Sequence, residues 1–289
     1  MWWSTLTGKL EQAKVLDPVT RTVSGAVNTV LPPGPVKDAL HGRWLGHALH
    51  PLLVAVPIGM WSGASLLDLT GGAGSRSAAR RLVGAGVLAV APTAASGLAD
   101  WSELGAFQRP TRVGLVHASA TTATTLLYVA SWLARRRGDY ARGRNLALAG
   151  AGGLVVGGYL GGHLAYSQGV GVNRNADEQR APRDWTDAAA VVDLDDGRPL
   201  RVEVSGQQVV LIRSRGEVYA MGAVCSHYGA PLDEGKRMLQ DGEECLECPW
   251  HSSRFRLTDG SVARGPATAP QLSYEVRTVA DRLQVRVRT

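Results

Sequence analysis

Four long stretches of this chain carry no charged side chain. They cover residues 44–67, 82–99, 113–134 and 145–173, and they are 24, 18, 22 and 29 residues long. A helix needs about 20 apolar residues to cross the hydrocarbon core of a bilayer. Soluble helices keep a polar face at helical spacing, and these stretches have none. The pattern therefore predicts a bundle of four transmembrane helices rather than four buried helices of a soluble protein.

The helices are expected near residues 51–69, 82–100, 113–134 and 145–167. In the last of them, Gly153, Gly157 and Gly161 recur at every fourth position, which lets two helices approach closely in lipid. Residues 1–43 have a mixed composition that is broken by prolines. We interpret them as a short amphipathic segment followed by a linker.

The pattern changes after Asn173. Residues 169–188 form a linker that becomes rich in Arg, Asp and Ala, and from residue 189 to residue 289 apolar and polar positions alternate. Such alternation is typical of half-buried strands. The predicted fold class is therefore a membrane α-helical bundle of four transmembrane helices, residues 44–168, followed by an all-β domain, residues 189–289.

The net charge of +6 arises in the apolar half, because residues 44–167 hold ten Arg and four acidic residues. Basic residues between apolar runs do not form the polar surface of a nucleic-acid-binding protein, so we expect no nucleic acid partner. Most of these Arg lie in the loops 70–81 and 135–144. The positive-inside rule places both loops in the cytoplasm. This slightly favours an extracytoplasmic β-domain on a multi-pass protein of a bacterial cell membrane.

Two short motifs in the β-domain carry metal-ligating side chains. They are Cys225-Ser-His227 and Cys248-Pro-Trp-His251, and each supplies one thiol and one imidazole. Two thiolates and two imidazoles are the ligand set of a Rieske [2Fe–2S] centre. Zinc can use the same four side chains. Zinc sites pair Cys with Cys and His with His, however, and this order favours the iron–sulfur cluster and leaves Cys245 as a free thiol.

Residues 189–289 resemble Rieske ferredoxins in these motifs and in Phe255, Asp259-Gly260 and Gly265-Pro266. The resemblance implies a [2Fe–2S] cluster on Cys225, His227, Cys248 and His251. It also implies a proline loop at Gly265-Pro266 beside the cluster.

Two further positions refine the resemblance. Rieske proteins of quinol-oxidising complexes carry an additional Cys in each loop, where this chain has Ala230 and Trp250. The resemblance is therefore to the ferredoxin and oxygenase-component type. Ser253 is expected to donate a hydrogen bond to a bridging sulfide.

Histidines from three of the predicted helices should meet at one face of the membrane. His47 and His50 lie at the start of the first helix, His117 in the first turns of the third, and His163 in the last turns of the fourth. Imidazoles on facing helices can ligate haem iron or bind the head group of a quinone. These four residues are our candidates for a haem b or quinone site, whereas His41 is expected at the surface.

The segment His47-Ala-Leu-His50-Pro51, together with Gly97-Leu-Ala-Asp100-Trp101 and His117, resembles a bacterial family of four-helix membrane domains of unknown function. The resemblance covers about residues 45–167. It supports the four-helix topology and implies no activity.

Together these features predict a membrane-bound electron-transfer protein. Its partners would be membrane lipid and a redox protein or quinone, with electrons passing between the cluster and a haem or quinol site in the helical domain. Two alternatives stay open, a membrane-anchored ferredoxin component of an oxygenase system and a redox sensor. An oxygenase iron site needs two His and a carboxylate, and no His follows His251. Any enzymatic role would thus be that of an oxidoreductase component.

Overall fold

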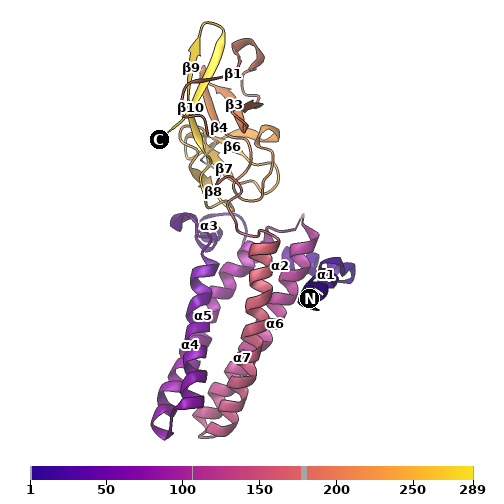
Figure 1. Ribbon diagram of the computed structural model, residues 1–289, viewed down its shortest axis with the longest axis vertical. Helices are drawn as coiled ribbons and strands as arrows, with labels where there is room; N and C mark the ends of the chain where they lie inside the picture. The colour runs from indigo at the N-terminus through magenta and orange to yellow at the C-terminus, as the bar shows by residue number, and fades with distance from the viewer. Residues whose placement is uncertain (1, 106, 177–180, 289) are drawn as a thin grey trace. The chain divides into compact units, whose positions relative to one another are not determined.

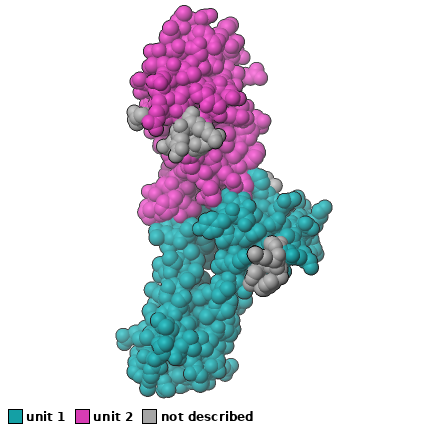
Figure 2. Space-filling model, viewed as in Figure 1, with its two compact units in different colours: residues 1–32, 49–170 teal, residues 33–48, 171–289 magenta. Residues whose placement is uncertain are grey.

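The computed structural model describes residues 2–105, 107–176 and 181–288. They form two compact units, coloured separately in Figure 2. Unit 1 consists of Met1–Pro32 and Leu49–Val170, and unit 2 consists of Pro33–Ala48 and Gly171–Thr289. Residues 33–48 therefore belong to the β-rich unit, although they precede the first long helix in the sequence.

Unit 1 contains four long helices (Figure 1). They are α4 (His50–Thr70), α5 (Arg76–Ser102), α6 (Gln108–Arg136) and α7 (Tyr140–Gly162), and the short helix η3 (Ala73–Ser75) precedes α5. A π-helical turn, η4 (His163–Ser167), continues α7. All four helices are long and apolar enough to cross a membrane, as the uncharged stretches predicted.

The outer surface of the four helices is apolar. Leu88, Leu126 and Val155 are 78%, 63% and 67% exposed. A soluble helix turns such side chains toward a protein core. Lipid is a suitable solvent for this surface, because exposing hydrocarbon side chains to lipid costs no free energy.

The predicted small-residue face of α7 packs against α6. A Cβ atom added at Gly153, Gly157 or Gly161 would contact the side chain of Thr124, Thr121 or His117, respectively. The absence of side chains at these three positions therefore allows the close approach of the two helices, as the spacing of four predicted.

Aromatic stacking fills the centre of the bundle. The rings of Trp61 in α4 and Tyr128 in α6 stack with their centroids 4.0 Å apart. Trp61 Nε1 also donates a hydrogen bond to the carbonyl of Val83 in α5, at 3.2 Å. Gly86 lies against the Trp61 ring and Gly150 against the Tyr128 ring, and neither position has room for a Cβ atom.

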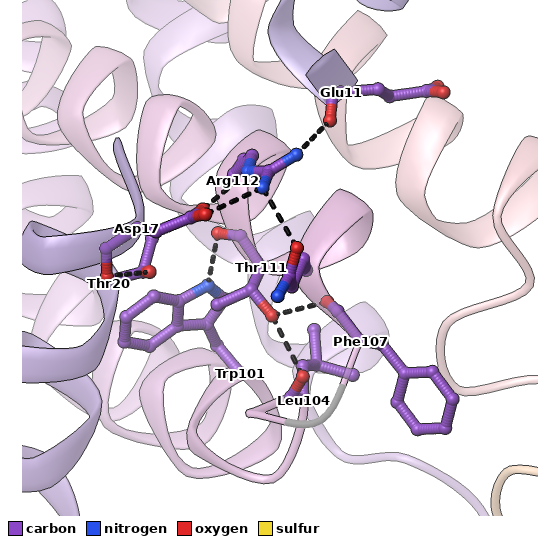
Figure 3. A network of polar contacts seen from close by, with 9 residues as sticks. Glu11, Asp17, Thr20, Trp101, Leu104, Phe107, Thr111 and Arg112 are labelled. Atoms are coloured by element: carbon purple, nitrogen blue, oxygen red, sulfur yellow. Dashed lines mark hydrogen bonds and ion pairs between the residues drawn. The ribbon is translucent and has the colours of Figure 1, made fainter. Parts of the chain in front are cut away.

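The N-terminal residues of unit 1 form α1 (Trp2–Gln12), η1 (Lys14–Leu16) and α2 (Asp17–Val30). Arg112, in the first turns of α6, fixes them (Figure 3). Its guanidinium donates to both carboxylate oxygens of Asp17, at 2.6 and 2.8 Å, and to the carbonyl of Glu11, at 2.6 Å. The hydrogen bonds from Arg112 lower the pKa of Asp17. The buried cation is thus neutralised within the unit.

Unit 2 contains two antiparallel sheets and confirms the predicted all-β domain. The larger sheet has the order β1 (Thr186–Ala190), β10 (Arg282–Val287), β9 (Ser273–Val279), β4 (Glu217–Gly222), β3 (Gln207–Ser214) and β2 (Leu200–Val204). The smaller has the order β5 (Lys236–Gln240), β6 (Glu243–Glu247), β7 (Arg254–Arg256) and β8 (Val262–Arg264). Short 3-10 turns are η6 (Val191–Asp193) and η7 (Leu232–Glu234).

Residues 33–48 add two short elements to unit 2. They are the helix α3 (Pro35–His41) and the turn η2 (Arg43–Leu45). His41 is only 2% exposed, so the expectation of a surface histidine is wrong. Gly265, which lies against the His41 ring, is 224 positions further along the chain, and the local sequence therefore did not reveal this burial.

Candidate metal centre

The first candidate loop follows β4 and carries Cys225 and His227. The Cys225 N–H donates to the carbonyl of Ala230, and the Gly229 N–H donates to the carbonyl of Cys225, both at 2.9 Å. Gly229 has a φ of 80°, a left-handed conformation that glycine adopts without strain. The loop is therefore a tight turn with Cys225 at its base.

The second candidate loop joins β6 to β7 and carries Cys248 and His251. The Cys248 N–H donates to the carbonyl of Ser253 at 2.8 Å, and the Ser252 N–H donates to the carbonyl of Cys248 at 3.1 Å. Ser252 takes a φ of 56° to close the turn. Both loops thus have the same construction, a cysteine at the base whose N–H closes the turn on a residue five positions later.

The structure brings the four predicted side chains together in pairs. Cys225 and Cys248 are 1% and 2% exposed, and their thiols are hydrogen-bonded to each other. The imidazole rings of His227 and His251 lie with their centroids 5.0 Å apart and their planes nearly perpendicular. One pair is therefore entirely sulfur and the other entirely nitrogen, although each loop contributes one member to both pairs.

The surroundings favour the ligating protonation states of Cys248 and His227, whereas Cys225 is held as a thiol. The hydrogen bond between the two thiols raises the pKa of Cys225 and lowers that of Cys248. Burial lowers the pKa of His227 to about 3, so its imidazole is neutral at physiological pH. Thiolates and neutral imidazoles are the forms that bind metal, and the protons of the thiols leave when a metal enters.

The pairing fits a two-iron cluster better than a single zinc ion. In a Rieske centre the thiolates bind one iron and the imidazoles the other. A structural zinc ion needs four ligands that converge on one point. In the part of the chain that the structure describes, no three His, Cys, Asp or Glu side chains converge in this way.

Two further residues near these loops are Ser253 and Cys245. The Oγ atom of buried Ser253 accepts a hydrogen bond from the Ala267 N–H at 2.9 Å, so its hydroxyl hydrogen stays available for another acceptor. The predicted bond to a bridging sulfide remains a prediction.

Cys245 is a free cysteine on β6, and burial raises its pKa to about 11. It is therefore not a reactive thiol.

Tyr228 is a neighbour of the imidazole pair that sequence reasoning missed. Its ring lies edge-on to His227 and His251, with centroid distances of 5.7 and 6.3 Å. The guanidinium of Arg174 lies over the Tyr228 ring at 5.5 Å. The one available signal was the position of Tyr228 directly after a candidate ligand.

Of the four histidines proposed for the membrane site, the structure relates His50 and His117. His50 Nδ1 lies 2.9 Å from the carbonyl of Thr93 in α5, and His117 Nδ1 lies 3.0 Å from the carbonyl of Gly157 in α7. A carbonyl only accepts, so Nδ1 carries the hydrogen in both rings. The two imidazoles lie close enough to interact electrostatically. In each neutral ring Nε2 is then the nitrogen with a free lone pair.

His163 and His47 have different surroundings. The Nε2 atom of His163 lies 2.8 Å from a carboxylate oxygen of Glu11 in α1. Burial raises the pKa of Glu11, but hydrogen bonds from His163 and Gln168 outweigh it and lower the pKa overall. His47 is exposed, belongs to unit 2, and has Nδ1 3.0 Å from the carbonyl of Ala48. Thus, within unit 1, backbone carbonyls hold His50 and His117 through Nδ1, and His163 has a carboxylate partner.

Comparison with known proteins agrees with this division of the chain. The family model described as the Rieske [2Fe–2S] domain matches residues 184–280. The model described as "Predicted membrane protein (DUF2231)" matches residues 46–174. A ferredoxin component of the naphthalene 1,2-dioxygenase/salicylate 5-hydroxylase systems of Ralstonia sp. is 30% identical over 105 residues, which are 36% of this chain and 97% of that protein.

Two other similarities concern the same part of the chain. Apoptosis-inducing factor 3 of Homo sapiens is 33% identical over 108 residues, which are 37% of this chain but only 17% of that protein. The solved ferredoxin of carbazole 1,9a-dioxygenase from Nocardioides aromaticivorans IC177 has 30% identity and a TM-score of 0.33, and the match covers 36% of this chain and 98% of that one.

Fold and site together define a Rieske-type iron–sulfur protein with a bundle of four helices that are long and apolar enough to cross a membrane. The chain belongs to the Rieske [2Fe–2S] ferredoxin family through residues 184–280, and residues 46–174 match the family model described as a predicted membrane protein.

Proposed function

We propose that this protein is a membrane-bound one-electron carrier whose cluster is held by Cys225, His227, Cys248 and His251. The observation that carries the proposal is the buried thiol pair beside the facing imidazole pair, in a chain that also has four helices able to cross a membrane. When bound, a [2Fe–2S] cluster takes up and returns one electron. The two loops supply the anionic and the neutral ligands, and their burial limits the access of water.

The helical unit would provide a second redox site at His50 and His117. Haem iron and a quinol hydroxyl have one requirement in common, an imidazole nitrogen with a free lone pair. The carbonyls of Thr93 and Gly157 hold both rings with Nε2 in that state. Gly97 lies against the His50 ring and Gly161 against the His117 ring, so no side chain crowds either imidazole at those points. The site would exchange electrons with the cluster.

The function is tested by quinol oxidation in proteoliposomes that contain the full-length protein. We expect quinol to reduce the cluster, and His50→Ala or His117→Ala to slow this reduction by roughly 100-fold, the usual effect of losing a positioned proton acceptor. His47→Ala should change it little. Absorption spectra of the reduced protein distinguish the two ligands, because haem bands appear only if the pair binds iron.

A second candidate function follows from the Ralstonia relative, which is a ferredoxin component of dioxygenase and hydroxylase systems. In that case a reductase protein, not quinol, would reduce the cluster, and the three histidine variants would behave like the wild type. This result would contradict the quinol proposal.

The chain would cross the cell membrane four times, with the Rieske domain outside. Arg76, Arg80 and Arg81 lie in or next to one connection between long helices, and Arg136, Arg137, Arg142 and Arg144 lie in or next to another. Arg135 does not count as a loop charge, because it is 1% exposed and paired with Asp68. The remaining Arg still favour a cytoplasmic location for both connections. The starts of α4 and α6 and the ends of α5 and α7 then face outward.

Reporter fusions test this orientation. We expect alkaline phosphatase at the C-terminal end to be active and green fluorescent protein there to be dark, because each reporter matures on only one side of the membrane. The same reporters placed after Arg137 should give the opposite pattern. A fluorescent C-terminal fusion would place the Rieske domain in the cytoplasm.

A further inference from the structure

Residues 33–48 form a short folded segment of unit 2, which we call the docking segment. It contains α3 and η2, joined by Gly42, whose φ of 88° suits glycine. Trp44 Nε1 donates to the carbonyl of Ala39 at 3.1 Å and closes the segment on itself. These local interactions help to define the shape of the segment.

Two charged side chains attach the docking segment to β8 and to the residue that follows it. The Asp38 carboxylate accepts a hydrogen bond from the Gly265 N–H at 3.0 Å. The Arg43 guanidinium donates to the carbonyls of Val262 and Ala263, at 3.2 and 2.9 Å. Asp38 and Arg43 also pair with each other at 3.5 Å, so the two contacts support one another.

The attached residues lead into the proline loop, Gly265-Pro266-Ala267. On one side of this loop, the Ala267 N–H donates to Ser253, which ends the second candidate loop, the one that carries Cys248 and His251. On the other side lies the docking segment, since a Cβ atom at position 265 would be 2.9 Å from Asp38 and 3.5 Å from the His41 ring. A larger residue at position 265 would therefore force the segment away.

The docking segment is also close to the imidazole pair. His41 is 2% exposed and interacts electrostatically with His227. Lys37 is likewise 2% exposed, so one side of α3 is fully covered. The segment thus lies over the proline loop and near a candidate ligand of the cluster, but outside the matched Rieske domain.

We propose that Asp38 and Arg43 are positioning residues that hold the docking segment against the proline loop and thereby keep water away from the histidine side of the cluster. The inference rests on the cluster assignment but not on any electron partner. Reduction adds one negative charge to the cluster, and water stabilises that charge. The docked segment excludes water and also carries the negative charge of Asp38. Both effects disfavour the added electron, so the docked segment lowers the reduction potential of the cluster.

The test compares Asp38→Ala with Asp38→Asn in the full-length protein. Alanine removes the acceptor of the Gly265 N–H, whereas asparagine keeps an acceptor oxygen and removes the charge. In Asp38→Ala we expect hydrogen exchange in residues 262–267 to become roughly 10- to 100-fold faster, as for the loss of a hydrogen bond to a charged group. In Asp38→Asn exchange should stay near the wild-type rate.

Reduction potentials, followed by electron paramagnetic resonance, should rise most in Asp38→Ala and less in Asp38→Asn. Exposed Asp195 provides the matched control, and Asp195→Ala should change neither readout.

If Asp38→Ala does not fold, Arg43→Ala takes its place, because half-exposed Arg43 can be removed without a cavity. It too should speed exchange in residues 262–267. Exchange and potential equal to those of Asp195→Ala would overturn the proposal. Because exchange needs no electron partner, a failure of the proposed function would leave this result unchanged.

Discussion

Replacing Cys225 with alanine abolishes the electron paramagnetic resonance signal of the reduced Rieske cluster, whereas replacing Cys245 leaves it intact. This is the largest effect that we expect on the metal centre. Cys225 shares a hydrogen bond with Cys248 at the base of the two ligand loops, and no other thiol can substitute for it. Cys245 is equally buried but lies on β6, outside both loops.

The measurement is the iron content together with the spectrum after reduction with dithionite. Wild type and Cys245→Ala should contain about two irons per chain, the content of a [2Fe–2S] cluster, and Cys225→Ala close to none. Cys245→Ala is a matched control, since it removes a buried thiol of the same size. An equal loss of signal in both cysteine variants, or zinc in place of iron in the wild type, would contradict the assignment.

The ligand loops could be predicted because each is a local structure. Cys225 and His227 are two positions apart and Cys248 and His251 three, so one tight turn fixes each pair. The four long helices could be predicted for a similar reason, since a run without charge reports on the lipid around it whatever the helix packs against. The glycine spacing in α7 likewise depends on a single helix face.

The contacts that could not be predicted join distant residues through groups without a sequence signature. Arg43 binds the carbonyls of Val262 and Ala263, and any residue has a carbonyl. His163 was expected to join the other histidines, but its partner is Glu11, which is 152 positions away in a segment that was interpreted only as amphipathic. In both cases tertiary packing, not local pattern, selects the partner.

Replacing Asp68 with alanine lowers the free energy of unfolding of the helical unit by about 3–5 kcal/mol, the cost of leaving a buried charge without its partner. Arg135 in α6 is 1% exposed, and its guanidinium donates to both carboxylate oxygens of Asp68 in α4. Its Nε also donates to Ser131, whose hydroxyl bonds the carbonyl of Gly143 in α7. The ion pair thus joins α4 to α6, and the hydrogen bonds through Ser131 extend the network to α7.

Unfolding by a denaturing detergent, followed by the fluorescence of the tryptophans in the bundle, measures the effect. Exposed Asp139 is the control, because it only caps α7 and its replacement by alanine should cost about 1 kcal/mol. The double variant Asp68→Leu/Arg135→Met separates the two explanations for a loss. If the cost comes from an uncompensated charge, the double variant recovers the wild-type stability or exceeds it, because no ion remains to be desolvated. If the pair itself is the source of stability, the double variant stays as unstable as Asp68→Ala.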